Sequence, residues 1–110
     1  MERVGRLEVR DHEEREDLTV AIEGELDLST VPELEQHIEA RIGGRETTLT
    51  LDMGGVTFMD SSGLRFLITL SERAEREGWT VRLLAPEHEA ATQVLRITGA
   101  DNALPFEKRP

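Results

Sequence analysis

Apolar patterns typical of strands and of helices alternate along the chain. Two-residue alternation of apolar and polar side chains marks residues 18–23, 47–53 and 79–83. Helical spacing of apolar residues marks the two segments between them, residues 31–42 and 61–77. Strands that alternate with helices of this length predict βαβ units, and therefore a mainly parallel sheet covered by helices.

The N-terminal part predicts an antiparallel hairpin at one edge of this sheet. Residues 4–10 alternate and indicate an edge strand, and the charged run at residues 11–17 indicates a turn. The strand at residues 18–23 follows so soon that the two strands are expected to pair antiparallel.

Cap and stop signals bound the helices. Thr30 and Glu33 have capping-box spacing at the start of the first helix. Gly78 is expected to end the second helix. The third helix is expected to begin at Pro86 and to end at Gly99.

The length of the chain limits the number of domains. A chain of 110 residues can build one hydrophobic core but not two. Gly54-Gly55 indicates a turn, and residues 104–106 indicate a short extended piece at the C-terminus. We therefore expect a single α/β domain over residues 1–110, with a mixed, mainly parallel sheet of four to five strands covered by helices.

Composition excludes several classes of function. The formal net charge of -10 disfavours binding to nucleic acid and to anionic membrane surfaces. The absence of cysteine excludes disulfides, thiolate metal sites and cysteine nucleophiles. No apolar run approaches the length of a transmembrane helix or a signal-peptide core. We expect a cytoplasmic protein that uses no metal and no cofactor.

The strand-to-helix turn at Asp60-Ser61-Ser62-Gly63 is the main candidate site. Asp60 is suited to cap the helix by accepting hydrogen bonds from the backbone N–H of Ser62 or Gly63. A phosphate on Ser62 would lie in the first helical turn, where the helix dipole favours it. Asp27 also follows a strand directly, so both loops are expected at one edge of the sheet.

The same residues permit two simpler interpretations. Asp and Ser before an apolar helical run are ordinary helix caps, and on these four residues alone a cap is the more common meaning. A catalytic serine is disfavoured because the sequence lacks the Gly-x-Ser-x-Gly elbow. The three histidines, His12, His37 and His88, are most simply surface residues without the order of a catalytic triad.

Four short segments carry a further signal. They are Gly24-Glu25-Leu26-Asp27, Leu51-Asp52, the run Phe58-Met59-Asp60-Ser61-Ser62-Gly63-Leu64, and the ending from Thr98 to Phe106. In this order and spacing they resemble the STAS domain, and most closely the bacterial anti-sigma factor antagonists. The resemblance covers nearly the whole chain.

This resemblance implies a regulatory switch rather than an enzyme. Such an antagonist binds an anti-sigma factor that is also a serine kinase of the histidine-kinase-like ATPase fold, and this binding frees the sigma factor. The kinase phosphorylates a serine that corresponds by position to Ser62, and a metal-dependent serine phosphatase resets the antagonist. The partner-binding surface carried over by the resemblance consists of Asp27, Asp60, Ser61, Ser62, Gly63 and Leu64.

The family also leaves a second role open. Some STAS domains are accessory subunits of membrane transport systems or scaffold parts of stress-sensing assemblies. A nucleotide hydrolase or esterase that uses Ser62 is a third, weaker hypothesis, because the sequence offers no evident base, metal cluster or phosphate loop.

Overall fold

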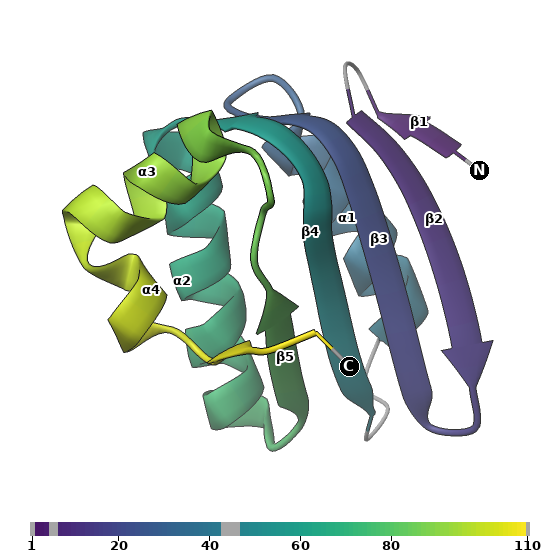
Figure 1. Cartoon of the computed structure of the whole chain (residues 1–110). Coiled ribbons are helices and arrows are strands. Elements are labelled where there is room, and N and C mark those ends of the chain that lie inside the picture. Colours follow the sequence, from purple (N-terminus) through teal and green to yellow (C-terminus); the bar gives the residue numbers. More distant parts are fainter. Residues whose placement is uncertain (1, 5–6, 43–46, 110) are drawn as a thin grey trace.

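A six-stranded sheet in sequential order forms the centre of the protein (Figure 1). The computed structural model describes residues 2–4, 7–42 and 47–109. The strands are β1 (Glu2–Val4), β2 (Leu7–Glu14), β3 (Asp17–Leu26), β4 (Thr48–Met59), β5 (Thr80–Leu84) and β6 (Phe106–Glu107).

The sheet is mixed and mainly parallel, as the alternation of patterns predicts. The pairs β1–β2 and β2–β3 are antiparallel, whereas β3–β4, β4–β5 and β5–β6 are parallel. The α/β fold class is therefore confirmed. The sixth strand arises because residues 2–4 form a separate strand, β1, that pairs with β2.

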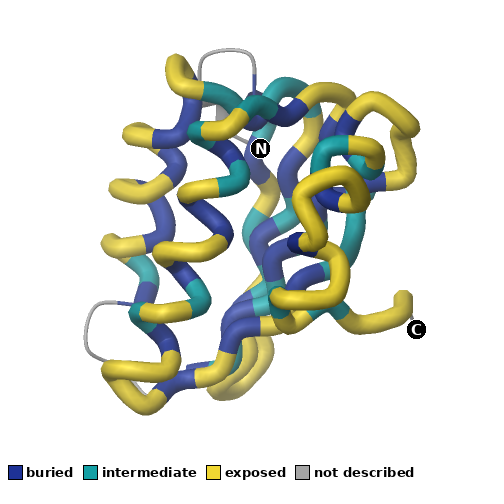
Figure 2. Tube along the Cα trace, turned by 90° about the vertical axis from the view of Figure 1, so that its left-hand side faces the viewer, coloured by how far each residue is buried: buried dark blue, intermediate teal, exposed yellow. Residues whose placement is uncertain are grey.

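Helices lie on one face of this sheet and along its β5 side (Figure 1 and Figure 2). They are α1 (Val31–Ile42), α2 (Ser61–Glu77), α3 (Glu89–Thr98) and the short α4 (Ala100–Ala103). Helices α1 and α2 lie behind the sheet in Figure 1, and α3 and α4 lie toward its β5 side. Figure 2 shows the buried residues along the sides of α1 and α2 that face the sheet.

The core between helices and sheet follows the predicted apolar stripes. Leu34 and Ile38 of α1 and Leu67 of α2 are at most 1% exposed. The predicted limits of α2, including the stop at Gly78 with its left-handed backbone, are confirmed. Ile68, which the periodicity places on the buried face, is 40% exposed instead. It lines a groove between α2 and the C-terminal segment instead of the core.

The predicted turn at residues 11–17 is wrong in extent. Strand β2 continues to Glu14 and β3 begins at Asp17, so the turn consists of Arg15 and Glu16 only. Charged side chains can extend a strand here because β3 satisfies the backbone of β2 while the side chains remain in water.

The predicted turn at Gly54-Gly55 is also wrong, because both glycines lie inside β4. The register between β3 and β4 shifts on either side of this region, which indicates β-bulges. A Cβ on Gly55 would lie 2.4 Å from Cγ of Glu23 on β3. The glycines therefore allow β4 to bulge and still stay close to its neighbour.

Two predictions about helices need correction. Helix α3 begins at Glu89, after the cap residue His88, and not at Pro86. At the start of α1 the Thr30 hydroxyl bonds backward: it accepts from the N–H of Asp27 and donates to the carbonyl of Glu25. Thr30 therefore closes the preceding loop, and Glu33 is exposed on the first turn of α1.

His37 is buried and not a surface histidine. It is 9% exposed, and its Nε2 lies 2.9 Å from both carboxylate oxygens of Asp11 on β2. Arg41 Nε also donates to Asp11. The periodicity of α1 misses this contact because Asp11, a polar residue of β2, lies where the side of the helix meets the sheet.

Candidate functional site

Two aspartate turns meet at the carboxyl ends of neighbouring parallel strands. Leu26 at the end of β3 is paired with Met59 at the end of β4, and an aspartate follows each of them. The N–H of Asp60 donates to the carbonyl of Leu26 at 3.3 Å. The structure thus brings the Asp27 loop and the Asp60 turn together, as the sequence predicts.

Asp60 caps helix α2 and also reaches the neighbouring loop. Its Oδ1 accepts hydrogen bonds from the N–H groups of Ser62 at 2.8 Å and Gly63 at 3.1 Å. This is the predicted N-cap. Its Oδ2 accepts a third hydrogen bond from the N–H of Leu28 at 3.3 Å, a contact across 32 positions of sequence. One carboxylate therefore holds both loops in place.

Asp27 uses its carboxylate within its own loop. Its Oδ1 accepts from the N–H of Ser29 at 2.9 Å, from the Ser29 hydroxyl at 2.7 Å and from the N–H of Thr30 at 3.2 Å. The hydrogen bond from the Ser29 hydroxyl is the main cause that lowers the pKa of Asp27 below its ordinary value, because it stabilises the ionised form. Asp27 thus stays ionised near neutral pH.

The two serines of the turn differ in exposure. Ser61 at the start of α2 is exposed, whereas Ser62 is half-buried. Ser62 lies on a groove of about 230 Å³ between the N-terminal parts of α1 and α2. The groove is lined by Leu28, Val31, Pro32, Glu35, Ser62, Arg65, Phe66 and Thr69.

Gly63 lies where the first turn of α2 packs against the ends of β3 and β4. It is buried, and a Cβ at this position would lie 2.6 Å from the carbonyl oxygen of Leu26 and 2.9 Å from Cγ of Met59. Only glycine allows the first turn of α2 to approach the ends of β3 and β4 so closely. Leu64, the next residue, is half-buried and packs against the core.

Sequence reasoning misses two apolar residues beside the turns. Leu28 is 73% exposed in the Asp27 loop, and Phe58 is 43% exposed near the end of β4. Single exposed apolar side chains are common on protein surfaces, but these two lie beside the aspartate turns. The available signal for Leu28 is an apolar residue between Asp27 and Ser29 in an otherwise polar loop.

The described residues offer no catalytic or metal-binding constellation around the serines. In this part of the chain His37 binds Asp11, His12 lies 3.9 Å from Glu14, and His88 precedes α3. None of the three is hydrogen-bonded to Ser61 or Ser62. Residues 2–4, 7–42 and 47–109 also contain no group of three or more His, Asp or Glu that could hold a metal ion.

A protein-family model matches most of the chain. The model described as "Mlab, STAS domain" matches residues 9–106, which include both aspartate turns. The chain belongs to the STAS domain family. The family predicted from the four sequence segments is therefore confirmed.

Solved structures share the fold of this STAS domain. An anti-sigma factor antagonist from Mycobacterium paratuberculosis is 26% identical, with a TM-score of 0.77 over 91% of this chain and 84% of that one. Unphosphorylated SpoIIAA, an anti-sigma factor antagonist, is 22% identical, with a TM-score of 0.75 over 94% and 89%. SpoIIAA, the Bacillus cell fate determinant, is also known in a phosphorylated form.

The same fold forms part of a larger chain. SLC26A9 is 20% identical over 84% of this chain, with a TM-score of 0.68, and the match covers 18% of the SLC26A9 chain. No helix among the described residues of the STAS domain itself has the length and apolar character needed to cross a bilayer.

Proposed function

We propose that this STAS domain is an anti-sigma factor antagonist switched by phosphorylation at the Asp60 turn. The observation that carries the proposal is the position of two serine hydroxyls in the first turn of α2, beside Asp60, Asp27 and the exposed Leu28. The similarity to anti-sigma factor antagonists over almost the full length supports it. The protein acts by binding and is not an enzyme.

Phosphorylation would change charge more than it changes the fold. A phosphoserine adds about -1.5 to -2 charges near neutral pH. The N–H groups of Ser62 and Gly63 already donate to Asp60, so a phosphate competes with a carboxylate instead of filling a vacant anion site. We expect Asp60 to repel the phosphate. We also expect the partner to be released, because the interface then contains uncompensated negative charge.

Ser62 is the proposed acceptor, and Ser61 is the alternative in the same turn. The family resemblance favours Ser62, while exposure favours Ser61, which is the more accessible hydroxyl. Separate substitution of each serine distinguishes them, because only removal of the acceptor abolishes phosphorylation by the kinase.

The proposal specifies the partners and the compartment. The unphosphorylated domain binds an anti-sigma factor serine kinase of the histidine-kinase-like ATPase fold through Asp27, Asp60, Ser61, Ser62 and Leu64, with Gly63 holding the turn. A metal-dependent serine phosphatase reverses the modification. All of these partners act in the cytoplasm, without direct contact to nucleic acid or membrane.

A quantitative pull-down from native lysate tests the proposal. The baits are wild type, Ser62→Ala, Ser62→Glu and Ser61→Glu, with partners identified by mass spectrometry. An ATPase-fold kinase captured by wild type and Ser62→Ala but lost from Ser62→Glu supports the switch at Ser62. Loss from Ser61→Glu alone moves the acceptor to Ser61. Equal capture of other proteins by all four baits contradicts the antagonist role.

The second candidate is an accessory role in a membrane transport system or a stress-sensing assembly. The fold shared with one part of SLC26A9 favours this alternative. It predicts that transporter subunits or a large homologous assembly are captured, and that substitution of Ser62 does not change their yield.

A further inference from the structure

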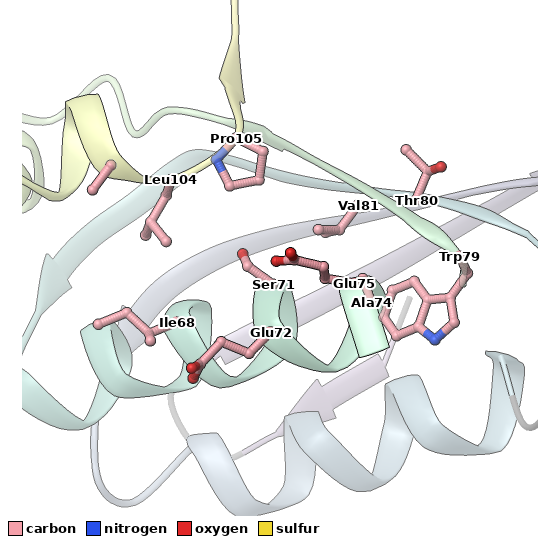
Figure 3. A pocket seen from close by; sticks show the side chains of 11 residues that line it. Ile68, Ser71, Glu72, Ala74, Glu75, Trp79, Thr80, Val81, Leu104 and Pro105 are labelled. Carbon is pink, nitrogen blue, oxygen red and sulfur yellow. The ribbon is translucent and has the colours of Figure 1, made fainter. Parts of the chain in front are cut away.

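The groove between α2 and β5 lies on a different part of the molecule from the Asp60 turn. It has a volume of about 740 Å³ and is formed by residues from α2, β5 and the segment around Pro105. Figure 3 shows that Ile68, Trp79, Val81, Leu104 and Pro105 surround it. Ile68 is 40% exposed here, which makes the floor of the groove apolar and accessible.

Strand β5 presents an open backbone edge to this groove. The N–H of Thr80 donates to Thr47 at the β4 side, and the N–H of Leu83 donates to Pro105 at the outer side. Backbone groups alternate in direction along a strand, so the N–H and C=O of Val81 point to the outer side, like those of Leu83. Strand β6 pairs only with Leu83 and Leu84. No described strand therefore pairs with Val81 on this side.

Two carboxylates flank the groove on α2. Glu75 points from α2 toward Val81 and Pro105, and Glu72 points away from β5 at the outer margin (Figure 3). Both are exposed, and neither forms a salt bridge with any residue that the structure describes. A groove with free carboxylates is complementary to a positively charged partner.

We propose that this groove binds an extended segment of a partner protein that carries aliphatic residues and a lysine or arginine. The N–H and C=O of Val81, which no described strand pairs on this side, select an extended backbone that can lie along β5 in line with β6. The apolar floor selects aliphatic side chains, and Glu75 selects the basic residue. The proposal is independent of the switch at Ser62, because the groove uses other residues.

A peptide titration followed by NMR tests the proposal on the full chain. The probe is the blocked peptide acetyl-Lys-Val-Lys-Val-Lys-amide, and the backbone amides of the protein are observed. We expect saturable shifts at Val81 and Leu104 that exceed those at Leu28 and Ser62. Glu75→Gln should weaken binding roughly threefold, because one exposed ion pair is lost. Glu35→Gln, on the other groove, should not change it.

Two matched probes make the test decisive. A peptide with an N-methyl group on every residue keeps its charge but has no residue N–H left to donate to a strand edge, so it should bind at least about tenfold more weakly. The peptide acetyl-Glu-Val-Glu-Val-Glu-amide should give no shifts at the same concentration. Equal binding of the methylated probe, shifts centred on Ser62, or no shifts at all would overturn the proposal. Shifts at Val81 on concentrating the protein alone would assign the groove to a second copy of this chain.

Discussion

The Asp27 loop and the Asp60 turn occupy equivalent places in the fold but are held differently. Each begins with an aspartate at the carboxyl end of a parallel strand, and each leads into a helix. Among the described residues, the Asp27 carboxylate accepts hydrogen bonds only from residues two and three positions ahead. Asp60 makes the same local bonds to Ser62 and Gly63 and adds a long-range bond to Leu28.

This difference shows which turn can influence the other. A change at Asp27 acts mainly on its own loop, because its described partners all lie within that loop. A change at Asp60 reaches both turns, since one oxygen caps α2 and the other holds the backbone of the exposed Leu28. The Asp60 turn is therefore the one from which a change can reach both loops.

The largest expected effect is on the stability contributed by helix α2, which begins directly after Asp60. Leu67→Ala should lower the free energy of unfolding by about 2–5 kcal/mol, because Leu67 is fully buried and its removal leaves a cavity. Urea unfolding measures this effect. Ile68→Ala is the matched control. The Ile68 side chain is 40% exposed, so its truncation should lower the free energy of unfolding by less. Equal losses would contradict the assigned orientation of α2.

Gly63→Ala tests the close approach beneath the turn. We expect a loss of about 1–3 kcal/mol, because the added methyl group meets the carbonyl oxygen of Leu26 at 2.6 Å. Ser61→Ala, at an exposed position, is the control and should change stability little. Helix propensity alone predicts a gain of roughly 1 kcal/mol for Gly63→Ala, so a more stable variant would contradict the tight contact.

Substitution of the two aspartates tests the comparison directly. Asp60→Ala and Asp27→Ala should each cost about 0.5–2 kcal/mol, the range for a lost cap. Only Asp60→Ala should also speed hydrogen exchange of the Leu28 amide, which NMR can follow.

Asp60→Asn sharpens this test. The asparagine can keep one acceptor oxygen for the cap, but its amide group cannot accept from Leu28 if the oxygen faces α2. We expect most of the stability to remain while the Leu28 amide loses protection. Faster exchange of Leu28 in Asp27→Ala, with none in the Asp60 variants, would reverse the proposed roles of the two residues.

The smallest effect is the pH dependence from Asp27. Its pKa is lower in the folded than in the unfolded protein, chiefly through the Ser29 hydroxyl. The ionised carboxylate therefore stabilises the fold fully above its ordinary pKa of 3.8 and loses this contribution as the pH falls through the lowered value. The effect should be on the order of a few tenths of a kcal/mol, because the group is well solvated.

Ser29→Ala isolates this contribution. Stability curves of wild type and Ser29→Ala should differ near neutral pH and converge in acid. A difference that stays constant down to the lowest pH would show that Ser29 acts without changing the titration of Asp27.

Local patterns sufficed for much of the fold and for part of the site. The stripe on α1, the limits of α2 and the Asp60 cap all follow from residues close in sequence, where spacing dictates geometry. The same logic failed at Gly54-Gly55, which suggests a turn in isolation. There the neighbouring strand β3 satisfies the backbone and allows a bulge, and no local pattern encodes that partner.

The sequence by itself determined that a βα turn with an aspartate and two serines exists, because capping and periodicity are short-range properties. Only the tertiary structure decided that Asp60 holds Leu28, that Gly63 packs against Leu26, that His37 is buried on Asp11, and that Val81 faces an open groove. These contacts join residues far apart in the chain. Their geometry depends on how the helices dock on the sheet, which spacing along the chain does not specify.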